Sequence, residues 1–192
     1  TEWPELDVYL TSVTDHFATA TIGGPNSKKI LNKLIPNLDL SDKNFPHMSF
    51  KEEKIGKINC RIMRISFTGE LSYEINVQAS YGKSLWEQCM DAGKEFNITP
   101  YGTETMHLLR AEKGFIIVGQ DTDATMTPID LQMDWIVSKK KYDFIGKRSL
   151  YRSDTIKDDR KQLVGLLTDN PNEILEEGAQ IVADVNKSPI EM

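Results

Sequence analysis

The sequence predicts an α+β fold in which a mostly antiparallel sheet packs against helices. The first observation is segment 71–77, where apolar and polar residues alternate strictly. This period of two is typical of a strand with one buried face. The second observation is the helical spacing of apolar residues in segments 80–96 and 103–113. The third is the irregular order of strands and helices along the chain, which favours an α+β architecture.

In the first half of the chain, the predicted strands are 8–13, 17–22, 58–65 and 71–77. The glycine turn at Gly23 and Gly24 leads into a predicted helix of about ten residues, with Pro25 at its first position. Segment 37–50 is rich in turn residues. Within 58–65 the alternation loses phase at Met63, so either a bulge lies there or both faces are covered.

Two helices follow the central strand. Ser80 is the predicted N-cap of the helix that ends near residue 96, and Thr103 that of the helix that ends near residue 113. Gly114 is the expected left-handed terminator of the second helix, before a predicted strand at 115–118. We expect these elements to form one domain, residues 1–151. The charged segment 152–161 reads as a linker, and 162–168 and 179–185 as strands of a second domain, residues 152–192.

Composition excludes several classes of protein. The chain has 192 residues, 39% hydrophobic and 27% charged, and a net charge of −6 without a dominating basic stripe. These values indicate a globular protein whose main partner is neither a nucleic acid nor a membrane. Lys139, Lys140 and Lys141 form one basic run, read as a solvated face or as a contact for an anionic ligand tail. Cys60 and Cys89 read as buried free thiols, which favours a reducing, cytoplasmic location.

Common catalytic and metal sites do not fit the sequence. The three histidines lie in separate segments, without the spacing of zinc ligands. A calcium loop starting at Asp121 fails because Met126 and Gln132 stand where glycine and glutamate are needed. No G-x-S-x-G nucleophile elbow is present. We therefore predict no metal site and name no catalytic residue from the spacing of residues.

Three ordered blocks carry a family resemblance. Segment 67–75, F-T-G-E-L-S-Y-E-I, resembles the signature of the folate-binding aminomethyltransferase family, to which the glycine-cleavage T-protein belongs. Segment 98–128, which begins I-T-P-Y-G-T-E-T-M-H-L-L-R-A-E-K-G, resembles one branch of it, the folate domain that ends the α subunit of heterotetrameric sarcosine oxidases. Segment 138–150 continues the match in register. The resemblance implies a ferredoxin-like arrangement in the first domain and the opening strands of a small β-barrel in the second.

The resemblance also implies the residues that bind tetrahydrofolate. Glu74 matches the glutamate that binds the pterin, since a rigid, shielded carboxylate can accept two parallel hydrogen bonds from the 2-amino group and adjacent ring N–H. Phe67 matches an aromatic residue, usually tyrosine, that packs on the ligand. Arg110 matches a family arginine, with a helix-to-sheet salt bridge as its alternative role, and Trp135 matches a tryptophan near the ligand, with a core role as alternative. Met106 replaces another family arginine, and the catalytic aspartate lies upstream of this chain.

The implied reaction belongs to a larger complex. A flavin site elsewhere oxidises sarcosine to an imine, which meets tetrahydrofolate here and becomes 5,10-methylenetetrahydrofolate, while flavin and NAD bind only in other parts of the complex. The alternatives are a T-protein or another folate-dependent methyl- or aminomethyltransferase, and a non-catalytic scaffold that joins sarcosine oxidase subunits. As an expectation, the chain is a fragment cut at both ends, inactive alone. Unpaired strand edges after residue 151 would make it self-associate or leave that region mobile.

Overall fold

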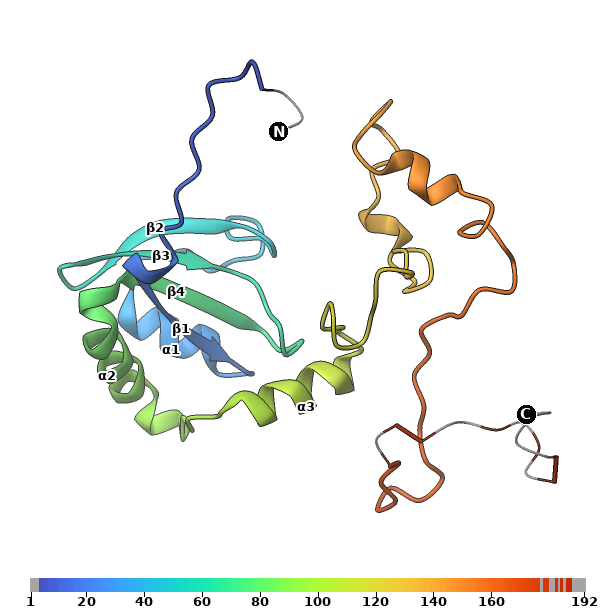
Figure 1. The fold of residues 1–192 in the computed structure, drawn as a ribbon. Coiled ribbons are helices and arrows are strands. Elements are labelled where there is room, and N and C mark those ends of the chain that lie inside the picture. The colour runs from blue at the N-terminus through green and yellow to red at the C-terminus, as the bar shows by residue number, and fades with distance from the viewer. Residues whose placement is uncertain (1–3, 177, 180–181, 183, 185, 188–192) are drawn as a thin grey trace. The chain divides into compact units, whose positions relative to one another are not determined.

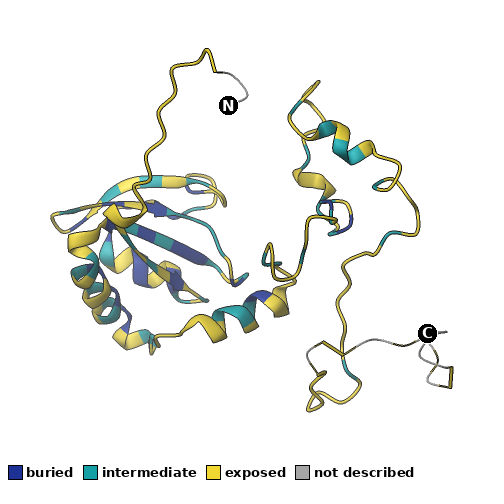
Figure 2. Cartoon of the chain, viewed as in Figure 1, coloured by how far each residue is buried: buried dark blue, intermediate teal, exposed yellow. Residues whose placement is uncertain are grey.

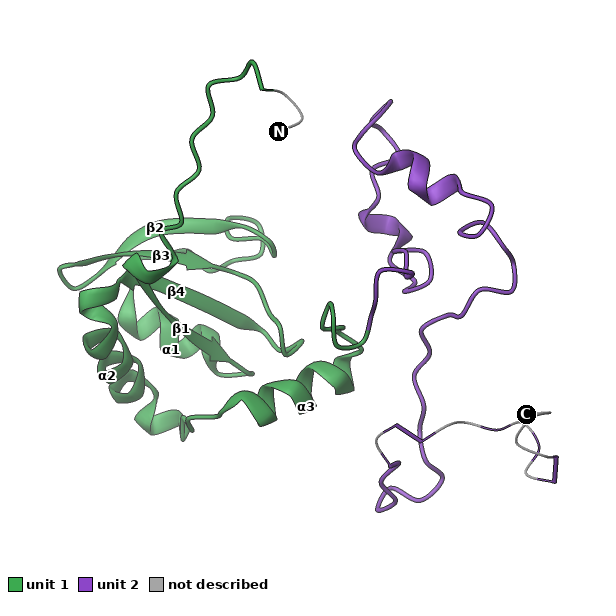
Figure 3. Ribbon diagram, viewed as in Figure 1, with its two compact units in different colours: residues 1–121 green, residues 122–192 purple. Residues whose placement is uncertain are grey.

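The structure is a computed structural model that describes residues 4–176, 178–179, 182, 184 and 186–187. The chain forms two compact units, residues 1–121 and residues 122–192 (Figure 3). The division at 121/122 does not test the predicted domain boundary at 151/152, which stays a prediction. Among the described residues, no helix has the length and apolar character needed to cross a membrane.

The first unit is built on a four-stranded antiparallel sheet (Figure 1). Its strands are β1 (Phe17–Gly23), β2 (Phe50–Ile55), β3 (Ile58–Met63) and β4 (Ser72–Gln78). The spatial order is β1-β4-β3-β2, so β4 lies inside the sheet and pairs with both β1 and β3. This arrangement confirms the predicted α+β class and the central position of segment 71–77.

Three α-helices accompany the sheet: α1 (Ser27–Leu34), α2 (Gly82–Gly93) and α3 (Thr103–Lys113). Helices α1 and α2 contact each other, and both pack on β1 and β4. Alternate β4 residues, Tyr73, Ile75 and Val77, are at most 1% exposed and form the centre of the core. Figure 2 shows this buried band along β4 and the inner side of α1. Burial of one β4 face fixes its register, because a slip by one residue would expose every core side chain.

Several predictions for the first unit are wrong in detail. Segment 8–13 is exposed and forms no strand, whereas β2 was not predicted. Helix α1 begins at Ser27, two positions after Pro25. Ser80 lies in a 3₁₀ turn before α2, and neither α2 nor α3 has a side-chain cap. The phase break in segment 58–65 is the end of β3 at Met63 rather than a bulge.

One predicted strand of the first unit is not formed, and the predicted barrel strands are not confirmed in the described residues. After Gly114, which has the expected positive φ of 79°, segment 115–118 leads into turns instead of a strand. Segment 162–168 has no strand partner in the described residues, and 179–185 lies partly outside them. The barrel strands therefore stay a prediction.

A polar cluster, rather than an apolar core, organises the second unit. Asp130 is 2% exposed, and its carboxylate accepts hydrogen bonds from Arg160 Nε at 2.7 Å and from the Thr127 backbone N–H at 2.7 Å. The Arg160 hydrogen bond holds the pKa of Asp130 well below its usual range. Because a lowered carboxyl pKa stabilises the folded state above the unfolded pKa, this contribution is present at neutral pH and is lost in acid. In the described part of this unit, no hydrophobic side chain is buried.

Hydrogen exchange should separate the two kinds of structure. We expect slow exchange for the amides of β4, which is paired on both sides. The amide of Leu163 donates to Asp130 O at 2.8 Å and should be partly protected. The amides of Val164 to Leu167 have no backbone partners among the described residues and should exchange within the dead time. Strong protection of Val164 to Leu167 in a monomeric chain would contradict this description.

Candidate functional site

The sheet face opposite α1 and α2 carries the candidate site. Because residues paired across antiparallel strands point to the same face, the register places Thr21, Glu74 and Met63 in one row of this open face. The next row is Thr19, Asn76, Arg61 and Glu52. Glu74 and Asn76 are half-buried, in contrast to Thr19, Thr21 and Arg61, which are exposed. The open face is therefore polar at its centre.

Glu74 is the chemically unusual residue of this face. Its carboxylate has no hydrogen-bond or ion-pair partner in the described part of the chain. Burial alone raises the pKa of Glu74 above its ordinary value. A half-buried carboxylate without a partner is costly to keep in a fold, so such groups are candidates for ligand binding.

Tyr101 is a residue on which the charge of Glu74 acts, and the sequence did not indicate it. Burial raises the pKa of Tyr101, and the negative charge of Glu74 raises it further. Tyr101 lies in the loop that leads from α2 to α3, so the loop brings a phenol hydroxyl into the electrostatic range of the carboxylate. The I-T-P-Y-G block contained this residue, but its spacing gave no indication of proximity to Glu74.

Phe67 lies in the turn between β3 and β4. Gly69, in the same turn, has a φ of 81°, and a Cβ there would lie 2.3 Å from the Lys113 side chain. Glycine is therefore required both by the backbone and by the packing of the end of α3 against the turn. Phe67 remains 37% exposed, so its ring is available on the approach to β4.

Arg110 is engaged elsewhere. It is 8% exposed on α3, and its Nη1 forms an ion pair with Asp121 and donates to Phe115 O at 3.2 Å. Asp121 also accepts a hydrogen bond from the Ile117 backbone N–H at 2.8 Å. Arg110 thus forms a salt bridge, as its alternative role predicted. Its partner Asp121, however, lies in the loop after α3 and not in the sheet. Arg110 positions the loop 114–121.

The remaining predicted site residue lies in the second unit. Trp135 is 73% exposed within the 3₁₀ helix Asp134–Ile136, so a role as a core residue of that unit is wrong. In the first unit, Met106 is half-buried and lines a hollow of about 610 Å³ together with Thr21 and Tyr101. Because methionine is uncharged, Met106 does not bring to this hollow the positive charge of the family arginine that it replaces.

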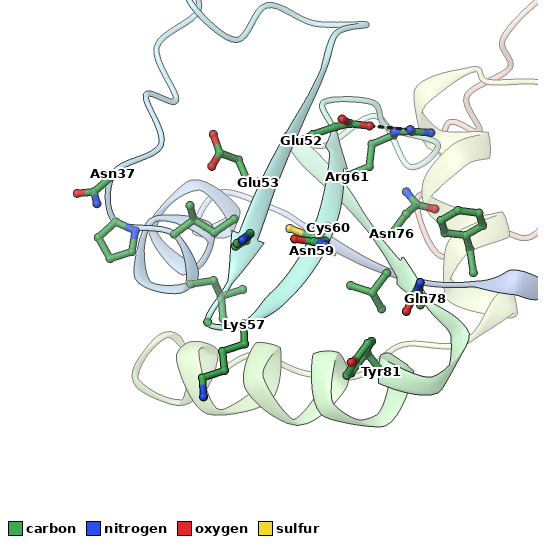
Figure 4. A pocket seen from close by; sticks show the side chains of 17 residues that line it. Asn37, Glu52, Glu53, Lys57, Asn59, Cys60, Arg61, Asn76, Gln78 and Tyr81 are labelled. Atoms are coloured by element: carbon green, nitrogen blue, oxygen red, sulfur yellow. Dashed lines mark hydrogen bonds and ion pairs between the residues drawn. The ribbon is translucent and has the colours of Figure 1, made fainter.

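A larger cleft, of about 890 Å³, is lined by residues of β2, β3 and β4 and by the end of α1. Figure 4 shows Asn76 and Gln78 of β4 on its wall, beside Arg61, which forms an ion pair with Glu52 at 2.7 Å. Neither this cleft nor the smaller hollow is lined by Glu74 itself. We place the candidate site on the open face, because that face holds the unpaired carboxylate of Glu74. The volume of a cleft alone does not indicate a binding site.

The described residues offer no metal site, since no group of three or more potential ligands lies together there. Cys60 and Cys89 are free and buried, as predicted. Burial raises the pKa of each thiol to about 11. Both are therefore protonated at neutral pH and are poor nucleophiles.

The first unit thus has an antiparallel sheet with a polar open face and a carboxylate at the centre of that face. Residues 1–141 match the family described as the GCVT N-terminal domain, so the chain belongs to that family. This confirms the resemblance seen in the sequence.

Particular relatives refine the assignment. The chain is 56% identical to the sarcosine oxidase subunit alpha of Corynebacterium sp. (strain P-1) over 96% of its length, and 41% identical to that of Rhizobium meliloti (strain 1021) over 94%. It is 36% identical to an aminomethyltransferase of Halothermothrix orenii over 72%. The chain covers 19%, 18% and 38% of these three relatives, respectively, and so spans only part of each.

Proposed function

We propose that this chain forms part of a tetrahydrofolate-binding domain in an α subunit of the sarcosine oxidase type. The observation that carries the proposal is the half-buried carboxylate of Glu74, which has no partner among the described residues and faces out from a rigid central strand. The greater identity to sarcosine oxidase subunits than to the aminomethyltransferase supports the choice of this branch.

The chemistry of the open face suits a reduced pterin. The 2-amino group and the adjacent ring N–H of a pterin point the same way, so one carboxylate accepts both hydrogen bonds. Pairing with these donors would compensate the charge whose burial raises the pKa of Glu74. Phe67, from the turn before β4, supplies an exposed aromatic face for packing against the ligand.

The proposed reaction uses an imine made by sarcosine oxidation at a flavin in another part of the complex. Tetrahydrofolate supplies the two amine nitrogens that take up the imine carbon as 5,10-methylenetetrahydrofolate, with release of glycine. The residues of this chain hold and orient the pterin and exclude water, which favours transfer over hydrolysis of the imine. The proton-handling aspartate implied by the family resemblance is not among these residues.

A scaffold function is the second candidate, and the surface of the second unit favours it. Large apolar side chains are exposed there in the described residues, among them Tyr142 at 94% and Ile145 at 73%. Exposed apolar groups of this kind often mark contacts with other subunits. Absence of saturable tetrahydrofolate binding in the intact complex would favour the scaffold over the folate site.

Titration calorimetry of the intact protein with tetrahydrofolate, repeated over a range of pH, tests the proposed function. Binding needs the ionised form of Glu74, and burial raises the pKa of this group above its ordinary value. We therefore expect affinity to fall as pH falls toward that raised pKa, at higher pH than for an ordinary glutamate. The Glu74→Gln variant corrects for titration of the ligand. Equal pH dependence in the wild type and this variant would contradict a role for the Glu74 carboxylate.

A further inference from the structure

Asn76 contains an unsatisfied hydrogen-bond donor beside Glu74. Asn76 lies two residues after Glu74 on β4, so the side chains of Glu74 and Asn76 both point from the open face. Asn76 Oδ1 accepts a hydrogen bond from Thr19 Oγ1 at 2.7 Å. Asn76 Nδ2 is buried and has no partner among the described residues. An unpaired buried donor lowers the stability of a fold, so its presence requires a reason.

The neighbours of Asn76 on the open face do not supply the missing acceptor. On one side, the Thr19 hydroxyl donates to Oδ1 and makes no hydrogen bond with Nδ2. On the other side, the paired residue is Arg61, whose guanidinium has only donors and is bound to Glu52. Asn76 also lines the cleft drawn in Figure 4. Among the described residues Nδ2 has no acceptor, so it is available for an acceptor of a bound ligand.

We propose that Asn76 is a second recognition residue of the site and that its Nδ2 donates to the ring carbonyl of the bound pterin. This inference rests on the proposed function. The recognition edge of a pterin presents an amino group, a ring N–H and then a carbonyl oxygen. The matching protein edge is a carboxylate followed by an amide donor, which is the order of Glu74 and Asn76 on one strand face. Their Cα atoms are about 7 Å apart, a spacing that the differing side-chain lengths can span.

The pairing makes Asn76 a specificity residue. A pteridine with an amino group in place of the ring carbonyl presents a donor where Asn76 also donates. Such a mismatch leaves two donors unpaired in a partly buried site and lowers affinity. Asn76 thereby selects the carbonyl form of the ring, while Glu74 provides the main anchor.

The test is calorimetric titration of the intact protein with tetrahydrofolate and with tetrahydropterin, which has the ring but lacks the tail. We expect Asn76→Ala to weaken both ligands by about tenfold, the loss of one buried hydrogen bond. Gln88→Ala is the control, because Gln88 is an amide on α2, which packs on the opposite face of the sheet, and lines neither the cleft nor the hollow. It should leave both affinities unchanged. Loss with tetrahydrofolate alone would overturn the assignment to the ring carbonyl.

A second readout separates recognition from a structural role. The wild type should prefer tetrahydropterin over its 2,4-diamino counterpart, and Asn76→Ala should reduce that preference, whereas a structural defect lowers both affinities equally. If Asn76→Ala does not fold, Asn76→Asp keeps the shape and the Thr19 hydrogen bond but replaces the donor with an acceptor, so it should lose at least as much affinity.

The outcomes distinguish this inference from the proposed function. If the wild type binds no tetrahydrofolate, the proposed function fails and the inference falls with it. If the wild type binds and Glu74→Gln binds weakly, while Asn76→Ala behaves like Gln88→Ala, only the role of Asn76 is overturned.

Discussion

Replacing Tyr73 with alanine is expected to lower the free energy of unfolding by about 3–5 kcal/mol, the cost of deleting a large buried ring. Tyr73 is 0% exposed, and its ring centroid lies 5.8 Å from that of Phe45. The cavity would form in the middle of β4, the strand whose register turns Glu74 to the open face. Chemical denaturation followed by circular dichroism measures the effect.

Tyr73→Phe is the control for this prediction. The Tyr73 hydroxyl has no hydrogen-bond partner in the described part of the chain, and burial raises its pKa. Removing the hydroxyl while keeping the ring should change stability by about 1 kcal/mol or less. If the alanine variant were as stable as the phenylalanine variant, β4 would not be the centre of the core.

Glu74→Gln should weaken tetrahydrofolate binding by about 1.5–3 kcal/mol, the scale of charge-assisted hydrogen bonds. Glutamine keeps the shape but offers one acceptor and one donor where the pterin presents two donors. Calorimetry on the intact protein measures the loss. Unchanged affinity would remove Glu74 from the site.

The same substitution should not harm the fold. Because the folded-state pKa of Glu74 is raised, the ionised carboxylate costs stability at pH values above that pKa. Glutamine removes this cost, so the variant should be at least as stable as the wild type at neutral pH. Failure of Glu74→Gln to fold would make the residue structural. Lower affinity combined with retained stability is typical of a functional group.

The sequence predicted the centre of the sheet better than its edges. Alternation in β4 is strict because Tyr73, Ile75 and Val77 are buried in the core, whereas Glu74 and Asn76 on the other face are only half-buried. Segment 8–13 also contains residues with high strand propensity, but it has no strand to pair with in the structure. Strand propensity alone does not form a strand without a pairing partner. Strand β2 was missed because its charged residues hide the pattern, although such charges are common on edge strands. The glycine turn at Gly56 was the available signal for this hairpin.

Side-chain contacts explain the strand that failed at 115–118. The Arg110 guanidinium donates a hydrogen bond to Phe115 O, and the Asp121 carboxylate accepts one from the Ile117 backbone N–H. These backbone groups are therefore satisfied without a strand partner. An apolar run alone does not reveal such a competitor.

The candidate site was predictable only in part. Motif resemblance identified Glu74, and alternation placed it on the polar face of a strand. The proximity of Tyr101 and the unpaired Nδ2 of Asn76 depend on loop geometry and on the register between β1, β3 and β4. These are tertiary relations without a local sequence pattern.

A crystal structure of the intact protein with bound tetrahydrofolate tests the central claim most directly. We expect the pterin on the open face of the first unit, with the Glu74 carboxylate oxygens about 3 Å from the 2-amino nitrogen and the adjacent ring nitrogen. A pterin bound away from Glu74, or held there without hydrogen bonds to its carboxylate, would contradict the claim.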